Sequence, residues 1–509
     1  MKNPDGYPVY EHASRGAHDL LLNREAEHKE AGHYTGLTSP SRNRWYQGRK
    51  FGWDHLKHII IFSRDGSPES LAAAETELIA TYADQLDSGQ VPNQVHLYGK
   101  HTIESKVTGS KKHNLYGQPP MGGIAGIELY HALEKQSPGA AKGFFSRIYP
   151  KLVKEARYWP TNMSNGPKDF RIGVIAGEET GMDESPIFDH QLPIKRKLRN
   201  GIDTPAAINA ANMAIHFTGR LLLDRRRNAL EDNEERLQKA KEIFWVMPVQ
   251  MQALVTANLR SLAKLAQKLD EHEESKILAK AAEDIETQVL NDIDDLTSPG
   301  MWDPEARGRR GMFRDLDRHG RPITAESRSG EITEETTVSN LMTLLFPTIK
   351  ERQLSSVVDM AMEEFMDEYG LSTVGKKSPS YDPNHGEKES GRWRGPAWLD
   401  QAWFLAEGLL VQINREDLSA EVKGKCKQLL NQLRETSLKT LGKWEEEGTP
   451  TPEYYSHLTG KAFRLYRVKW FAWNKLGYVM PPATNLSVFA EALLKRIGFD
   501  EEEQKPLAA

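Results

Sequence analysis

Apolar residues recur at helical spacing along most of this 509-residue chain, whereas alternating strand patterns are scarce. Ser67-Pro68-Glu69 predicts a helix start, with Ser67 as the cap and Pro68 in the first turn. Thr204-Pro205 predicts another. The apolar face after Ser67 is predicted to contain Leu71, Leu78, Ile79, Tyr82 and Leu86. The other predicted helices are 122–135, 141–158, 233–245, 249–268, 271–294, 336–346, 349–368, 398–413, 418–446 and 485–496.

No Gly/Ser-rich linker divides these helices. A run of helical hairpins without a linker favours one closed domain over several separate ones. We therefore expect an all-α fold in which the helices form a closed toroid.

Composition argues against several classes of protein. A net charge of −5 gives no electrostatic case for binding nucleic acid or an anionic membrane. No apolar run approaches the ~20 residues of a membrane span, and the N-terminus has no apolar signal region. The single cysteine, Cys426, rules out an internal disulfide. We expect a cytoplasmic protein with neither a nucleic acid nor a membrane as partner; whether it forms a homo-oligomer stays open.

One segment of the sequence concentrates carboxylates that are candidates for acid catalysis. The run from Glu178 to Glu184 holds four carboxylates in seven residues, and Gly181 and Pro186 predict a loop there. Clustered carboxylates repel one another, so one of them should have a raised pKa if the loop is partly buried. A carboxylic acid that stays protonated near neutral pH can protonate the leaving oxygen of a glycoside. An acidic surface loop is the other interpretation.

Long loops rich in Gly, Pro, Trp, Asp and Arg separate the predicted helices. Loops of this length usually carry function, so we expect them to meet at one rim of the toroid. They are residues 31–54, 88–121, 159–204, 295–335, 370–397 and 447–470.

These loops contain the side chains of a carbohydrate site. Indoles pack on the faces of sugar rings, while carboxylates, amides and arginines bind hydroxyl groups. Each candidate is also compatible with a purely structural role. The candidates for substrate binding are Trp53, Asp54, Gln118, Trp393, Arg394, Gly395, Trp398 and Tyr455.

Five segments carry a family resemblance, and they follow one another in this order: Gly52-Trp53-Asp54, Gln118-Pro119-Pro120, Glu179 through Pro186, Trp393 through Trp398, and Glu453-Tyr454-Tyr455 through Gly460. With them the chain resembles glycoside hydrolase family 63, in particular its compact mannosylglycerate and glucosylglycerate hydrolases. The resemblance divides the chain into an N-terminal extension at 1–30, a catalytic domain at 31–497 and an acidic, polar tail at 498–509.

This resemblance implies an (α/α)6 toroid that hydrolyses a small α-glycoside with inversion. The sixteen histidines show no HExxH or similar metal pattern, and we expect neither a metal nor another cofactor. It places the general acid on Asp183 and the general base on Glu453. Mannosylglycerate and glucosylglycerate are the expected substrates. Glu184, Arg392 and His457 depart from the family pattern and put the aglycone in doubt. A trehalase-like or oligosaccharide-trimming α-glucosidase and a non-catalytic sugar-binding toroid remain alternatives.

Two further segments raise questions about ligands. Residues 31–50 are rich in hydrogen-bond donors and could fold over an anionic aglycone, with Tyr34, Tyr46 and Gln118 as candidate donors. A solvated basic loop is the alternative. The cationic residues of this loop are Arg42, Arg44, Arg49 and Lys50.

Residues 315–326 have acidic side chains at some offsets of a calcium loop, but His319 and Pro322 spoil the pattern. Whether this loop binds a cation is left open.

Overall fold

The computed structural model describes residues 21, 49–96, 116–182, 185–191, 234–326, 331–383, 393–447 and 454–463. Helix dominates this part of the chain, and its strands are only two to four residues long. The prediction of an all-α fold is therefore confirmed. The extension at 1–30, the tail at 498–509 and the predicted helices near 204 and at 485–496 lie outside the described residues, apart from Leu21.

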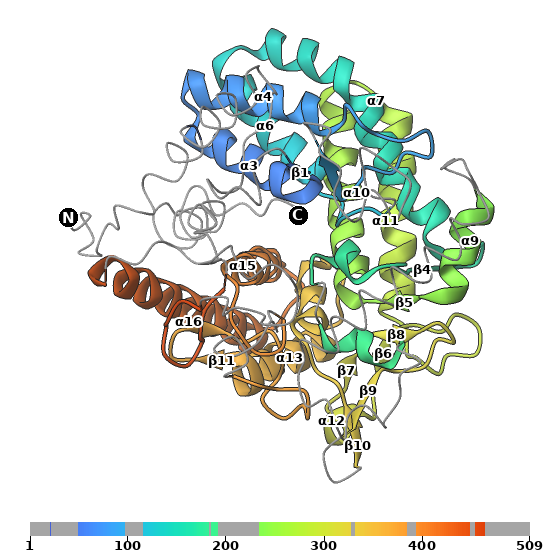
Figure 1. Cartoon of the computed structure of the whole chain (residues 1–509), viewed down its shortest axis with the longest axis vertical. Helices are drawn as coiled ribbons and strands as arrows, with labels where there is room; N and C mark the ends of the chain where they lie inside the picture. The colour runs from blue at the N-terminus through green and yellow to red at the C-terminus, as the bar shows by residue number, and fades with distance from the viewer. Residues whose placement is uncertain are drawn as a thin grey trace, which may run out of the picture.

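Helices of the described part form an inner and an outer layer (Figure 1). Each inner element packs against the next inner one, and each is followed in the chain by its outer partner. The inner elements are α3 (Gly52–Asp65), α6 (Gly122–Gln136), α10 (Val249–Lys268), the 3-10 helix η3 (Val338–Leu345) and α15 (Leu399–Ile413). The outer partners are α4 (Pro68–Thr81), α7 (Pro138–Asn162), α11 (His272–Val289), α13 (Glu351–Met360) and α16 (Ala420–Glu446).

Burial follows this layering. Inner helices α10 and α15 are buried almost all round, as expected of helices enclosed by others. Outer helix α11 buries one stripe, including Leu278, Ala282, Ile285 and Val289, at spacings of three and four residues. The connections between helices therefore carry most of the irregular structure.

Short antiparallel strand pairs occupy those connections. They are β1 (Arg49–Phe51) with β2 (Gln94–His96), β3 (Ser164–Gly166) with β4 (Asp169–Ile172), β5 (Val246–Met247) with β8 (Leu316–Asp317), β6 (Trp302–Asp303) with β7 (Met312–Phe313), β9 (Thr324–Glu326) with β10 (Ile332–Glu334), and β11 (Met366–Asp367) with β12 (Gly370–Leu371). Short helices complete the described elements: η1 (Gly177–Thr180), η2 (Pro186–Gln191), α9 (Glu234–Ile243), α12 (Ala306–Arg309) and η4 (Ala361–Phe365).

Helix α4 begins where the sequence predicted. The Ser67 hydroxyl accepts a hydrogen bond from the Ser70 backbone N–H at 3.3 Å, and this caps the helix. Leu71, Leu78 and Tyr82 are buried as expected, but Ile79 is 51% exposed, so its inward placement was wrong. Ile79 follows Leu78 by one residue, a rotation of about 100° that turns it away from the buried face.

Three other predictions about helices need correction. The sequence predicted no helix at α3, because its residues are nearly all buried and show no polar face. The segment predicted as a helix at 336–346 is the 3-10 helix η3, which a reciprocal cap between Thr337 and Asn340 opens. The helix predicted at 349–368 ends at Met360, and the π-helical turn η4 and strand β11 follow it.

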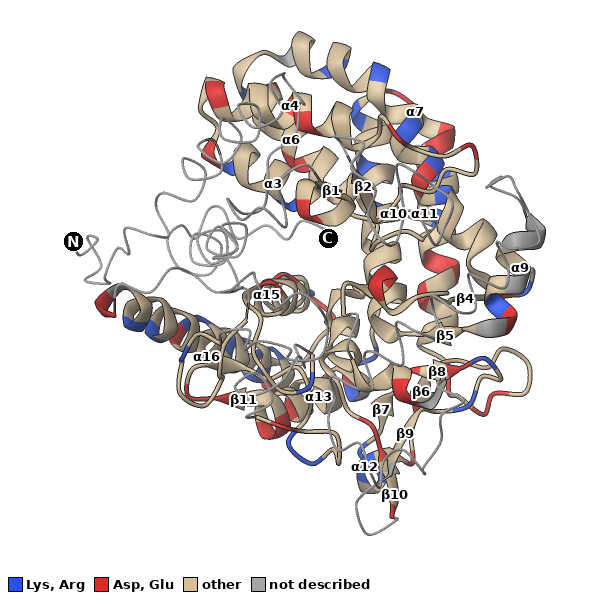
Figure 2. Ribbon diagram, viewed as in Figure 1, with Lys and Arg blue, Asp and Glu red and all other residues tan. Residues whose placement is uncertain are grey.

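Charge is spread over the outer layer. Figure 2 shows Lys and Arg along α7 and both signs of charge along α16. Among the described residues, no helix combines the length and the hydropathy that crossing a membrane requires.

Candidate active site

The first turn of α3 carries Trp53 and Asp54, so this motif lies on a helix and not on the predicted loop. The Trp53 backbone N–H donates to Gln118 Oε1 at 2.8 Å, which joins two of the predicted site segments. The buried Trp53 indole stacks on Phe404, with ring centroids 6.4 Å apart. Lys57 Nζ lies 3.4 Å from the same ring centroid. We call Trp53, Asp54 and Lys57 the helix wall.

A buried ion pair ties the helix wall to α15. Lys57 Nζ donates to Asp400 Oδ2 at 2.8 Å, and both side chains are almost completely buried. The two residues are 343 positions apart in the sequence. Because each charge would be costly to bury alone, the pair fixes the start of α15 against α3.

The acidic segment contacts the helix wall at Trp53. Glu179 is buried, and its two carboxylate oxygens accept backbone N–H groups of Gly117 at 3.0 Å and Ile175 at 2.7 Å. Gly181 has φ +70°, and a Cβ atom there would lie 2.4 Å from the Trp53 ring. Only glycine allows this backbone both that conformation and that close approach.

Residues 393–398, which we call the tryptophan loop, form a second part of the candidate site. The indoles of Trp393 and Trp398 stack with centroids 4.1 Å apart and planes 10° apart. Trp398 also stacks on Tyr454, with centroids 5.5 Å apart. The Gly395 backbone N–H donates to Thr373 Oγ1 at 3.0 Å, which anchors the loop.

Tyr455 lies in a packed apolar cluster beside this loop. Its ring meets the edge of Trp444 at 5.0 Å, and its backbone pairs with Ala397. Burial raises the pKa of its hydroxyl. This packing favours a structural role for Tyr455, and its predicted contact with substrate stays a prediction.

Arg394 makes a bidentate ion pair that the sequence did not predict. Its Nη1 and Nη2 atoms donate to Asp189 Oδ2 at 2.9 Å and Oδ1 at 2.5 Å, although the two residues are 205 positions apart. Asp189 lies in η2, six positions after Asp183, and belongs to no motif that would have singled it out. The predicted binding of sugar hydroxyls by Arg394 stays a prediction.

A second carboxyl group lies near this pair. Glu335 is buried and accepts hydrogen bonds from Ser378 Oγ at 2.5 Å and Ser380 Oγ at 2.6 Å. Burial raises the pKa of Glu335 to about 7; the two serine hydroxyls and Arg394 oppose this rise, and the negative charge of Asp189 adds to it. No sequence signal pointed to Glu335. It is the last residue of the predicted loop 295–335, and its carboxylate binds two serines of the predicted loop 370–397.

Some buried polar atoms on the motif segments have no hydrogen-bond partner within the described residues. They include Nε1 of Trp393, Oγ of Ser185 and Nδ1 of His457. Buried polar groups nearly always find a partner, so such atoms are candidates for binding a ligand.

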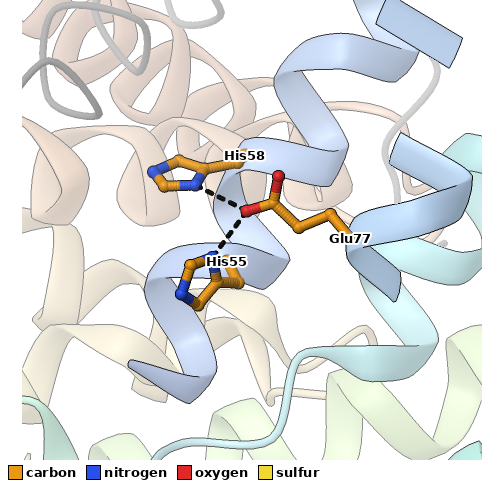
Figure 3. A group of neighbouring side chains, drawn as sticks. All are labelled: His55, His58 and Glu77. Carbon is orange, nitrogen blue, oxygen red and sulfur yellow. Dashed lines mark hydrogen bonds and ion pairs between the residues drawn. The ribbon is translucent and has the colours of Figure 1, made fainter. Parts of the chain in front are cut away.

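Beneath the helix wall lies a buried cluster of His55 and His58 on α3 and Glu77 on α4 (Figure 3). Both Nδ1 atoms contact the same carboxylate oxygen, at 2.5 Å from His55 and 2.9 Å from His58. Burial alone would raise the pKa of Glu77, but the hydrogen bonds from both histidines outweigh it and lower that pKa. Burial lowers the pKa of His55.

Among the described residues, this is the one group of His, Cys, Asp and Glu side chains close enough together to bind a metal ion. A tetrahedral ion bound at about 2.0–2.2 Å would hold its ligand atoms about 3.3 Å apart, farther than the contacts to Glu77. Metal-bound histidines also donate their second ring N–H, whereas both Nε2 atoms have no partner within the described residues. The geometry favours a hydrogen-bonded cluster that fixes α3 to α4.

The acidic residues at 315–317 also bind within the protein. Asp315 Oδ1 accepts from the Val249 backbone N–H at 2.7 Å and from Ser339 Oγ at 2.7 Å. Asp317 accepts the backbone N–H groups of His319 and Arg321 and closes a turn. These contacts give both carboxylates structural partners without a cation.

Four predicted site residues lie outside the described residues: Tyr34, Tyr46, Asp183 and Glu453. The structure corrects the prediction for Lys50, which was counted among the cationic residues of the donor-rich loop 31–50. Its ammonium donates to the Thr81 carbonyl at 2.7 Å and to Asp84 at 3.2 Å, so this buried charge stabilises the end of α4 and does not face an aglycone.

Known proteins resemble this chain over most of its length. The mannosylglycerate hydrolase MGH1-like glycoside hydrolase domain matches residues 49–473. Mannosylglycerate hydrolase MGH1 of Selaginella moellendorffii is 25% identical over 357 residues, which cover 65% of this chain and 64% of that protein. The chain thus spans less than two thirds of that relative's length.

Solved structures agree with the sequence match. The mannosylglycerate hydrolase of family 63 from Thermus thermophilus, in complex with Tris and D-glycerate, has a TM-score of 0.65 at 19% identity, over 94% of this chain and 100% of that one. Neutral trehalase Nth1 from Saccharomyces cerevisiae has a TM-score of 0.51 at 13% identity, over 90% and 73%. With an (α/α)6 toroid fold and a family match over most of its length, the chain belongs to the mannosylglycerate hydrolase MGH1-like glycoside hydrolase family.

Proposed function

We propose that this protein is an inverting α-glycosidase that hydrolyses mannosylglycerate or glucosylglycerate. The observation that carries the proposal is the meeting of segments from distant parts of the sequence. Gly181 contacts Trp53, and Asp189 binds Arg394, so two residues that flank Asp183 in the sequence contact the helix wall and the tryptophan loop. Family membership supports the same chemistry.

The proposed reaction uses two carboxyl groups on opposite sides of the sugar. Protonated Asp183 donates its proton to the glycosidic oxygen as the bond to the anomeric carbon breaks. Glu453 accepts a proton from a water molecule that attacks the same carbon from the other face. The products are the sugar with inverted anomeric configuration and the free aglycone. The proposal requires carboxyl groups roughly 6.5–9.5 Å apart, because the water must fit between the base and the sugar.

Sugar binding is assigned to the walls of the site. Trp393 Nε1 and Ser185 Oγ, which lack protein partners in the described part of the chain, suit sugar hydroxyls. Asp54 offers a carboxylate at the start of α3. Tyr34, Tyr46 and Gln118 are the proposed donors to the glycerate carboxylate.

The test is a hydrolysis screen with mannosylglycerate, glucosylglycerate, trehalose, kojibiose and nigerose. We expect turnover of at least one glycerate glycoside and, by proton NMR, a first product of inverted anomeric configuration. Asp183→Asn and Glu453→Gln should each lose several orders of magnitude in kcat while melting near the wild-type temperature. Retained configuration, or near-normal activity in Asp183→Asn, would reject the mechanism, and turnover of trehalose alone would reject the substrate.

A further inference from the structure

The tryptophan loop has contacts on both sides of the proposed reaction. On one side Arg394 binds Asp189, which follows Asp183 by six positions. On the other side Trp398 stacks on Tyr454, the residue directly after Glu453. We propose that this loop is a spacer that fixes the distance between the general acid and the general base; the inference rests on the proposed function.

The acid-side link is short and stiff. Ser185 N–H donates to the Met182 carbonyl at 2.9 Å, and Phe188 N–H donates to the Ser185 carbonyl at 3.2 Å, so hydrogen bonds connect Met182 through Ser185 to Phe188, the residue before Asp189. Ile187 and Phe188 are buried and hold this turn in the core. The planar guanidinium of Arg394 then fixes the carboxylate of Asp189 in both distance and orientation, which a lysine cannot do.

The base-side link joins backbone to backbone. Ala397 N–H donates to the Tyr455 carbonyl at 2.8 Å, and Tyr455 N–H donates to the Ala397 carbonyl at 3.1 Å. Together with the stack of Trp398 on Tyr454, this pairing ties the tryptophan loop to the residue that directly follows Glu453 in the sequence.

The loop between the two links is itself rigid. Trp393 and Trp398 stack at its two ends, and Pro396 restricts the backbone between them. The Arg394 carbonyl accepts from Asp382 N–H at 2.9 Å, and the Gly395 carbonyl accepts from Thr373 N–H at 3.3 Å. A displacement at one link is therefore transmitted to the other.

The distance that this spacer sets decides the chemistry. Inverting and retaining glycosidases differ by only about 1–4 Å in carboxyl separation, and an error of ~1 Å can cost about 100-fold in rate. Arg394 and Asp189 are thus positioning residues for the acid, and Trp398 is a positioning residue for the base.

Two substrates that differ in their leaving group distinguish positioning of the acid from positioning of the base. A dinitrophenyl glycoside of the preferred sugar needs no proton on departure, whereas the glycerate glycoside does. Asp189→Asn and Arg394→Lys should lose about 100-fold in kcat/KM on the glycerate glycoside but less than about 10-fold on the dinitrophenyl glycoside. Trp398→Leu should lose a similar factor on both substrates, because attack of water is impaired in each case.

Asp169 and Arg171 provide a matched control. They form a comparable ion pair on β4, with Arg171 Nε and Nη2 bound to Asp169 at 2.8 and 2.6 Å. The side chains of the two pairs are also exposed to a similar extent. Arg171 is 6% and Asp169 21% exposed, and Arg394 is 7% and Asp189 18% exposed. Asp169→Asn should change kcat/KM less than about twofold on either substrate, in contrast to Asp189→Asn.

Equal losses of kcat/KM on both substrates in Asp189→Asn and Arg394→Lys would overturn the acid-side link. Activities no lower than those of Asp169→Asn would also overturn it.

Thermal melting shows whether each variant is folded. If Asp189→Asn does not fold, Arg394→Lys still tests the link, because lysine keeps the charge and nearly the volume of arginine. If Asp183→Asn is fully active on the glycerate glycoside, the proposed function fails and the acid-side link fails with it. If Asp183→Asn is inactive while Asp189→Asn is unaffected, the link alone fails.

Discussion

The helix wall and the tryptophan loop are built in different ways. The helix wall stands on α3, which Glu77 fixes to the next helix in the chain through His55 and His58. The tryptophan loop has no helix of its own, and its ion pair to Asp189 joins residues 205 positions apart. Both walls contribute to the hydrophobic core, but one stands on a helix and the other is a loop that connects segments distant in the sequence.

This difference predicts different consequences of mutation. Changes beneath the helix wall should appear mainly as losses of stability, because they remove buried partners between packed helices. Changes in the tryptophan loop should appear mainly as losses of activity, because they alter the placement of reacting groups. The variants below test this contrast.

Glu77→Ala should have the largest effect on stability. It removes the acceptor of two buried histidines and should lower the free energy of unfolding by about 3–5 kcal/mol, measured by urea denaturation at pH 7. Because the pKa of Glu77 lies below its usual 4.5 in the fold, its contribution is present above pH 4.5 and declines as the pH falls below that value. Glu69→Ala, at an exposed position of α4, should cost less than about 1 kcal/mol. Equal losses in the two variants would contradict a special role for the cluster.

Lys57→Met should cost about 3 kcal/mol, because Asp400 remains buried without its cation. The double variant Lys57→Met/Asp400→Leu should recover most of this loss, since no buried charge is left unpaired. Lys142→Met removes a partner of the exposed pair with Asp270 and should leave the stability nearly unchanged. A double variant as unstable as the single one would show that the pair itself, and not the unpaired charge, sets the stability.

Glu335→Gln should change the pH dependence of stability. The pKa of Glu335 rises from its usual 4.5 to about 7 in the fold, so between these values the folded protein holds a proton that the unfolded chain releases. Rising pH therefore destabilises the wild type, by up to about 3 kcal/mol at pH 8 relative to pH 4.5. Glutamine cannot ionise, so the variant should lose this dependence in urea denaturation across that range. Parallel curves for both proteins would reject a raised pKa.

Gly181→Ala should have the smallest effect on stability and a visible effect on activity. A side chain there requires a left-handed conformation and a displaced Trp53, at about 1–2 kcal/mol, and it should lower kcat/KM about tenfold or more. Gly143→Ala, in an exposed position of α7 with no atom near the added Cβ, should instead stabilise by up to about 1 kcal/mol. Unchanged activity in Gly181→Ala would argue against close packing of the acidic segment on the indole.

Local patterns in the sequence determined most of the helical framework. The predicted helix at 249–268 matches α10, and those at 122–135 and 418–446 lie close to α6 and α16. Ser67 caps α4 as its neighbours indicated. These features depend on side-chain periodicity and on hydrogen bonds within a few residues, so the sequence alone suffices to predict them. The order of the motifs likewise identified the family.

Tertiary structure decided how the site is assembled. Helix α3 escaped prediction because burial on all sides removes the polar face that would reveal a helix. The turn η4 ends a helix that periodicity would continue, at a point where Arg307 binds Glu364. The pairing of Arg394 with Asp189 has no local signal, because each side chain alone is compatible with solvent or with substrate. Partners that are distant in sequence become neighbours only when the helices pack, and that packing determines which charges are structural and which remain for chemistry.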